Sequence, residues 1–171
     1  MAILGRNIYT LLLSLFPIII LFFLVLTDLD FSFGEKQLIS FNLIYVVIYY
    51  WILKKPELLS YSLIFFAGVI NDIVTGLPIG ISSIDYLFLC GIASYFRNIT
   101  LRPSLIIDWL AFFPTLLIIN SIHYSILKVF FETDINYYYL IANTFLTLAI
   151  YPLAGIFFNI VFKLISPSKY D

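Results

Sequence analysis

The sequence predicts an all-α polytopic membrane protein with about six transmembrane helices joined by short loops. Of its 171 residues, 63% are hydrophobic and only 11% are charged, and the mean hydropathy is +1.07. A soluble domain carries about 25% charged residues, so this chain has too little polar surface to cover a water-soluble globule. Apolar segments also recur along the whole chain between short polar breaks. We therefore expect a single integral membrane domain over residues 1–171.

The apolar segments predict six transmembrane helices. These are residues 8–26, 38–53, 58–74, 81–96, 104–127 and 138–165. A transmembrane helix needs about 20 residues, with a range of about 17–25, so the second segment is short and the sixth is long. Five spans are therefore an alternative to six. Pro114 and Pro152 lie inside the last two segments and are expected to bend them.

The first apolar run is expected to be an uncleaved helix and not a signal peptide. It follows Arg6 and extends from Ile8 to Leu26, which is longer than the apolar region of a secretory signal. No cleavage pattern of small residues follows it. We therefore count this run as the first transmembrane helix.

The distribution of Lys and Arg predicts the orientation. If the N-terminus is cytoplasmic, seven of the nine Lys and Arg residues lie on the cytoplasmic side of six spans. Those seven are Arg6, Lys54, Lys55, Arg97, Arg102, Lys163 and Lys169. The opposite side has only Lys36 and Lys128. Because cytoplasmic loops carry an excess of Lys and Arg, we expect both termini in the cytoplasm.

Two aromatic clusters are expected at the membrane surface. One precedes the Lys54-Lys55 pair, and the other opens the last helix. The clusters are Tyr49, Tyr50 and Trp51, and Tyr137, Tyr138 and Tyr139. Tyr and Trp are enriched at the headgroup level, so this is where we expect both.

Several classes of function find little support in the sequence. The net charge of −1 gives no broad basic surface for nucleic acid, and one His with one Cys gives no metal-site spacing. Cys90 lies in an apolar run and is interpreted as a packing residue. No phosphate-binding loop and no intramembrane-protease motif is found. We therefore expect no enzymatic activity, no cofactor and no metal.

The most informative polar cluster lies between the third and fourth expected helices. Asn71 and Asp72 lie near the end of the third helix, and Gly76, Pro78 and Gly80 follow. Glycine permits a left-handed turn or a close helix approach, and proline fits the first turn of a helix. One interpretation is a buried, structured turn that Asp72 fixes or offers to a partner. The alternative is an interfacial Asp beside a routine turn.

Other polar residues in the apolar segments have structural explanations. Asp85 is expected to cap the freed backbone of residues 76–80, and Asp108 is expected in the first turn of the fifth helix, where Arg102 could also pair with it. Asn120 and His123 are three residues apart and share a helix face. We expect them, with the amides of the sixth helix, to form interhelical hydrogen bonds.

Between Tyr49 and Tyr95 the chain has Tyr50-Trp51, then Pro56, then Gly68 and Asp72 in one apolar segment, and then Gly76-Leu77-Pro78-Ile79-Gly80. This stretch resembles the rod shape-determining protein MreD family of bacterial inner membranes. The family has a Tyr-Trp before a short proline-containing turn, a helix that ends in a Gly and an Asp, and a Gly-x-Pro-Leu-Gly turn. The matching residues here are Trp51, Pro56, Gly68, Asp72, Gly76, Pro78 and Gly80. Ile79 stands where the family usually has Leu. The specific match covers about a quarter of the chain, and the last two helices match only in hydropathy.

The resemblance implies a non-enzymatic role in the cell-elongation (Rod) complex, also called the elongasome, which maintains rod shape. A protein of this family would contact the transmembrane helix of MreC. It would be linked indirectly to MreB filaments, to RodA and to a class B penicillin-binding protein, and so to peptidoglycan synthesis. Gly68, Gly76, Gly80, Gly91 and Ala93 could give the small-residue surface for such a helix.

The main alternative is a transporter subunit. The family's fold looks like the six-helix substrate-binding S component of energy-coupling-factor (ECF) vitamin transporters, so the fold alone does not decide between them. A subunit of this kind requires a polar pocket that opens to the outside. A tightly bound vitamin would favour the transporter.

Overall fold

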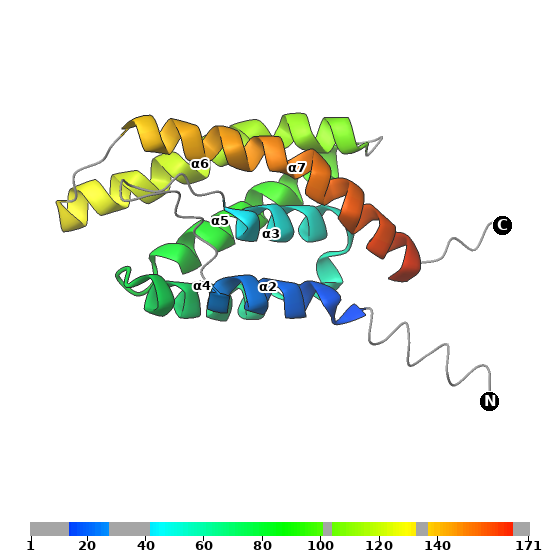
Figure 1. Ribbon diagram of the computed structural model, residues 1–171, viewed down its shortest axis with the longest axis horizontal. Helices are drawn as coiled ribbons and strands as arrows, with labels where there is room; N and C mark the ends of the chain where they lie inside the picture. Colours follow the sequence, from blue (N-terminus) through cyan, green and yellow to red (C-terminus); the bar gives the residue numbers. More distant parts are fainter. Residues whose placement is uncertain (1–13, 28–41, 101–103, 133–136, 166–171) are drawn as a thin grey trace.

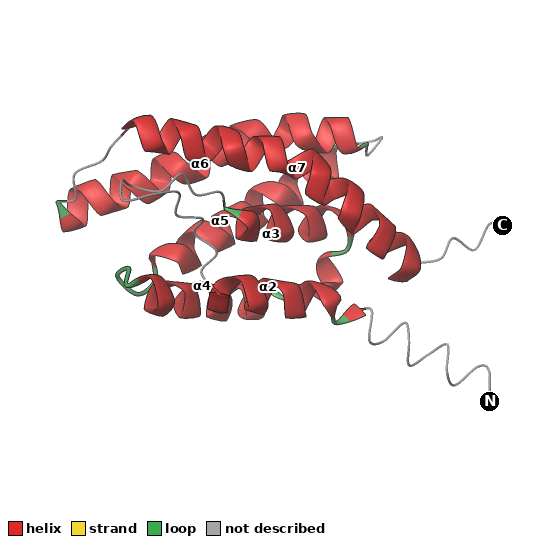
Figure 2. Cartoon of the chain, viewed as in Figure 1, coloured by secondary structure: helices red, strands yellow, loops and turns green. Residues whose placement is uncertain are grey.

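The computed structural model describes residues 14–27, 42–100, 104–132 and 137–165, and these form helices and short loops with no strand among them (Figures 1 and 2). The elements are α2 (Phe16–Thr27), α3 (Leu43–Lys54), the 3-10 helix η1 (Pro56–Leu58), α4 (Tyr61–Thr75), α5 (Ile81–Ile99), α6 (Leu105–Phe131) and α7 (Tyr137–Ile165). The expected all-helical fold is thus confirmed over the described residues. Residues 8–13 and 38–41, which the first two expected helices include, lie outside them.

Successive α-helices run back and forth between two ends of the molecule (Figure 1). The turn end holds the α4–α5 connection, residues 76–80, together with the end of α6 and the start of α7. The basic end holds Lys54, η1, the end of α5 and the end of α7. Both outer limits of the described chain, at the start of α2 and the end of α7, lie at the basic end.

The centre of the bundle is formed by α3 and α5. Helix α5 packs against α3, α4 and α6, while α7 packs against α6 and α3, and α2 packs against α3 and α4. Every residue of α3 from Tyr45 to Ile52 is buried. A helix that is apolar all round belongs in the interior of a fold, and α3 is placed there.

The first aromatic cluster lies inside the bundle and does not face outward. Tyr49, Tyr50 and Trp51 are buried, with at most 1% of any of them exposed. Phe158 of α7 lies 5.3 Å from the Tyr50 ring and 6.2 Å from the Trp51 ring. Their position beside Lys54 predicts the headgroup level of the membrane, and the structure adds that α7 packs over α3 and covers them.

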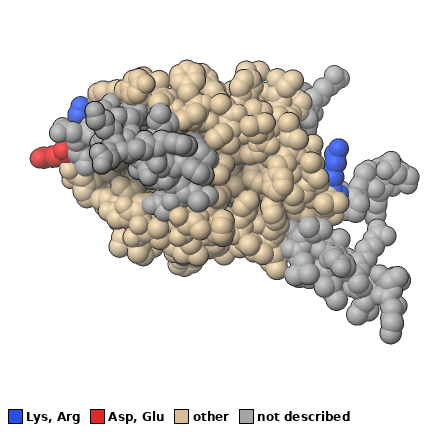
Figure 3. Space-filling view, viewed as in Figure 1, with Lys and Arg blue, Asp and Glu red and all other residues tan. Residues whose placement is uncertain are grey.

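The outer faces of the bundle are apolar. Large hydrophobic side chains such as Phe66 on α4, Leu110 on α6 and Leu153 on α7 are more than half exposed. In the space-filling view, the described charged side chains lie at the two ends, with none between them on this face (Figure 3). An exposed apolar area of this size is typical of a surface covered by lipid or by a partner.

Two of the described helices are long and apolar enough to cross a membrane. These are Leu105–Phe131 in α6 and Leu140–Ile165 in α7, and only 28% of the most apolar window of each is buried within the bundle. Helices α2, α3 and α4 are apolar but shorter. The fold is consistent with a helical membrane protein.

Several helix boundaries differ from the sequence prediction. The helix expected at 58–74 begins later, at Tyr61, because η1 occupies Pro56–Leu58 and Ser60 then caps α4 by accepting a hydrogen bond from the backbone N–H of Leu63. Helices α5 and α6 continue beyond their expected ends at 96 and 127, to Ile99 and Phe131. Helix α7 bends along its length, as expected for a helix with Pro152 inside it (Figure 1).

Candidate functional site

The α4–α5 turn is anchored by one buried carboxylate. Asp72, in the last turn of α4, is fully buried. Its Oδ2 accepts a hydrogen bond from the backbone N–H of Gly80 at 2.6 Å, and its Oδ1 accepts one from the N–H of Ser82 at 3.0 Å. These N–H groups lie at the start of α5, where a helix has no internal partners for its donors. Asp72 therefore fixes the turn and caps the next helix, although it lies eight to ten residues earlier in the chain than the groups it caps.

Two glycines give the turn its shape. Gly76 ends α4 with φ of +71°, and Gly80 precedes α5 with φ of +107°. Residues other than glycine rarely adopt these angles. Pro78 lies between the glycines and before the first turn of α5, so it does not begin that helix as the sequence suggested. Its carbonyl accepts a hydrogen bond from the N–H of Ile81 at 3.4 Å.

Gly68 allows α4 and α5 to approach closely. A Cβ atom built on Gly68 would lie 2.5 Å from the Cα of Ser83, which is closer than real atoms approach. The Ser83 hydroxyl donates a hydrogen bond to the carbonyl of Phe65 at 3.1 Å, one turn earlier in α4. Gly68 was expected to provide a surface for a partner helix. Helix α5 of the same chain packs against it instead.

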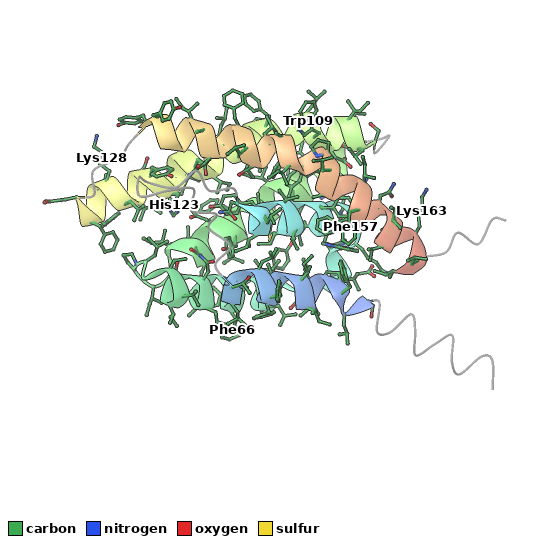
Figure 4. The ribbon with its side chains drawn as sticks, in the orientation of Figure 1. Phe66, Trp109, His123, Lys128, Phe157 and Lys163 are labelled. Atoms are coloured by element: carbon green, nitrogen blue, oxygen red, sulfur yellow. The ribbon has the colours of Figure 1, made fainter. Side chains whose placement is uncertain are left out.

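Asp85 does not cap the turn as expected. It lies on α5 with 1% of its side chain exposed, and its Oδ2 is 2.5 Å from Nδ1 of His123 on α6. Its Oδ1 has no hydrogen-bond partner of good geometry among the described residues, although the Tyr45 hydroxyl interacts with the carboxyl group. Figure 4 shows His123 inside the bundle, facing away from the outer surface of α6. The sequence placed both residues near the same end of neighbouring helices but did not predict their pairing.

A polar pocket opens beside this pair, at the turn end. It has a volume of about 370 Å³ and is lined by residues of all six α-helices or their caps. Its polar lining residues are Asn42, Asn71, Asn120, Asn143, Thr75, Thr147, Ser82, His123, Tyr45, Tyr86 and Tyr124. No Lys, Arg, Asp or Glu occurs among the described residues that line it. Its size and uncharged polar lining suit a small molecule with hydrogen-bonding groups.

Hydrogen bonds hold several of these polar residues in place. Asn71 donates to the Ser82 hydroxyl at 3.0 Å, which ties the end of α4 to the start of α5. Asn120 donates to the Thr144 hydroxyl at 2.7 Å, joining α6 to α7. The interhelical hydrogen bonds expected for Asn120 and His123 are thus confirmed, and they form the wall of the pocket.

The structure does not bring all the predicted site residues together. Asp72, Gly76, Pro78 and Gly80 form the turn, and Gly68 lies two turns below it along α4. Trp51 and Pro56 lie at the basic end. Trp51 is fully buried, and its indole N–H has no hydrogen-bond partner among the described residues.

Asp108 forms an ion pair at the basic end. Its Oδ2 lies 2.7 Å from Nζ of Lys54, and the carboxylate is 5% exposed. The partner proposed from the sequence was Arg102, which lies outside the described residues. Lys54 reaches Asp108 because α3 ends where α6 begins, a proximity that sequence spacing does not reveal.

The described residues do not form a metal site. No group of three or more His, Cys, Asp or Glu residues among them could hold a metal ion. What they offer is a rigid turn at one end, an adjoining pocket and a basic cluster at the other end. Searches against protein-family models, curated proteins and solved structures found no match to the chain.

Proposed function

We propose that the protein is a non-enzymatic component of the cell-elongation complex in a bacterial inner membrane, of the MreD type. The observation that carries the proposal is the α4–α5 turn. The residues that resemble the family between Gly68 and Gly80 take part in one structural unit, in which Asp72 accepts hydrogen bonds from Gly80 and Ser82. The gathering of Asp72, Gly76, Pro78 and Gly80 in one turn supports the proposal.

The proposal includes six membrane spans with the basic end in the cytoplasm. Lys54, Lys55, Arg97 and Lys163 lie at the basic end, against Lys128 alone among the described cations at the turn end. An excess of Lys and Arg favours the cytoplasmic side. The turn end, with its polar pocket, then faces the periplasm.

A protein with short loops must act through partners in the membrane plane. Helix α4 leads into the turn, and its Phe66 points outward (Figure 4). Phe66 and Ile73 are 58% and 63% exposed. Such a face can be covered by a single transmembrane helix. The proposed partner is the MreC helix, and through it MreB, RodA and a class B penicillin-binding protein.

A detergent pull-down of the tagged full-length chain from its native membranes tests the proposal. Mass spectrometry should identify both co-purifying proteins and small molecules. Recovery of MreC or a peptidoglycan synthase, with no stoichiometric metabolite, is the expected result. Recovery of neither protein from membranes that contain both would contradict the proposal.

The second candidate function is a substrate-binding S subunit of a vitamin transporter of the ECF type. The pocket of about 370 Å³ at the turn end favours it, because such a subunit requires a polar pocket on the outer side. The same pull-down separates the two functions. An ATPase-coupled transducer or a stoichiometric vitamin in the eluate would identify a transporter subunit.

A further inference from the structure

A second cavity lies at the basic end, away from the turn and its pocket. It has a volume of about 350 Å³ and is bounded by α3, α5, α6 and α7. Lys54, Arg97, Asp108, Thr100 and Asn159 supply its polar groups. Neither proposed function uses this cavity.

The charges around the cavity do not balance. Lys54 is paired with Asp108 at 2.7 Å, and these two charges cancel. Arg97, in the last turn of α5, is exposed and has no ion pair with any described residue. The lining therefore has one positive charge in excess, and it is carried by a guanidinium. This group presents a planar set of N–H donors that matches the oxygens of a phosphate.

Other groups near the cavity also favour an anion. Lys163 is exposed on α7, four residues after Asn159 and therefore on the same face of the helix (Figure 4). Helix α6 begins at Leu105, one turn before Asp108, so the positive end of its dipole lies at this end of the molecule. Lys55 adds a further cation beside Lys54.

The other residues that line the cavity are apolar, and an apolar lining favours a lipid over a soluble anion as the ligand. Leu53 and Phe162 line the cavity beside the charged groups. A phosphate joined to a glycerol and acyl chains would place its charge near Arg97 and its hydrocarbon against these side chains. Thr100 and Asn159 are within the same lining and could bond to headgroup hydroxyls. Basic pockets between transmembrane helices on the cytoplasmic side are known to bind acidic lipid headgroups.

We propose that the cavity bounded by Lys54, Arg97 and Asn159 binds the phosphate of an anionic phospholipid headgroup. The inference depends on the membrane placement of the basic end in the proposed function, but not on the role in cell elongation. The lipid would hold the ends of α3, α5, α6 and α7 at the membrane surface.

Native mass spectrometry of the full-length chain in an uncharged detergent tests the inference. The chain is titrated with dioleoyl-phosphatidylglycerol and, separately, with zwitterionic dioleoyl-phosphatidylcholine. We expect tighter binding of phosphatidylglycerol, and we expect Arg97→Gln to weaken that binding about fivefold, the effect of one basic residue near a lipid surface. Arg97 is exposed, so the variant should keep the wild-type Tm.

Lys128→Gln is the matched control, because it removes an exposed cation from the opposite end. Its binding of phosphatidylglycerol should equal that of the wild type. Equal binding of the two lipids, or equal loss in both variants, would overturn the inference. Competition by inorganic phosphate at the same concentration as the lipid would assign the site to a soluble phosphate and also overturn it. None of these outcomes depends on whether MreC is recovered in the pull-down.

Discussion

The buried Asp85 of α5 pairs with the partly exposed His123 of α6, with 2.5 Å between Oδ2 and Nδ1. The two residues are 38 positions apart and join neighbouring helices just below the polar pocket. His123 is the one described residue within salt-bridge distance of this carboxylate. The pair therefore fixes the register of α5 and α6 at the turn end.

Removal of His123 alone should be costly. His123→Leu removes the ion-pair partner of the buried Asp85, and breaking a fully buried pair costs about 3–5 kcal/mol of unfolding free energy, an upper limit here because His123 is 18% exposed. The double variant Asp85→Asn with His123→Leu should recover part of that loss, because no uncompensated charge is then buried. Equilibrium unfolding in detergent measures both. A double variant at least as unstable as the sum of the two single variants would contradict this role of the pair.

The two carboxylate oxygens of Asp72 should stabilise the folded protein. Asp72→Ala removes the partners of the Gly80 and Ser82 N–H groups, and each buried donor left without a partner costs about 1–3 kcal/mol. Asp72→Asn keeps one acceptor oxygen and should lose less. Thermal unfolding in detergent should rank wild type, Asn and Ala in that order. Glu57→Gln, an exposed acid at the basic end, is the control and should leave Tm unchanged.

The turn illustrates what local sequence predicts well. Gly76 and Gly80 surround Pro78, and this pattern predicted a structured turn because few other residues adopt positive φ. The buried interpretation of Asp72 is confirmed, since its carboxylate is fully buried and bonded to the turn. These features depend on residues within about ten positions of one another.

Features that depend on distant segments were predicted poorly. Asp85 was assigned to the turn because it is near in sequence, whereas α6 supplies its actual partner. The burial of Trp51 was not predicted, because it results from α7, which covers this residue in the folded chain. In both cases the deciding contact comes from a helix much later in the chain, and helical periodicity does not reveal which helices become neighbours.

Gly68 and Gly91 offer a matched pair of substitutions. Gly68→Ala places a Cβ 2.5 Å from the Ser83 backbone, so α4 and α5 must separate and stability should fall by about 1–3 kcal/mol, the usual cost of overpacking. Gly91→Ala meets no atom within 4 Å and should be neutral or stabilising by about 0.5–1 kcal/mol, because alanine favours a helix interior. Chemical denaturation in detergent compares them. Equal stability of the two variants would show that the α4–α5 crossing is not tightly packed.

The turn should also matter for partner binding if the proposed function is right. Asp72→Ala removes the anchor of the turn, and Gly76→Leu forces a left-handed backbone angle on a residue that resists it, at a cost of about 1–2 kcal/mol. Asp108→Ala instead breaks the Lys54 pair at the opposite end. In pull-downs normalised to the amount of folded chain, the first two variants should recover less MreC than Asp108→Ala does. Wild-type recovery by all three variants would mean that the α4–α5 turn has no part in assembly, and recovery reduced equally in all three would point to a general loss of structure.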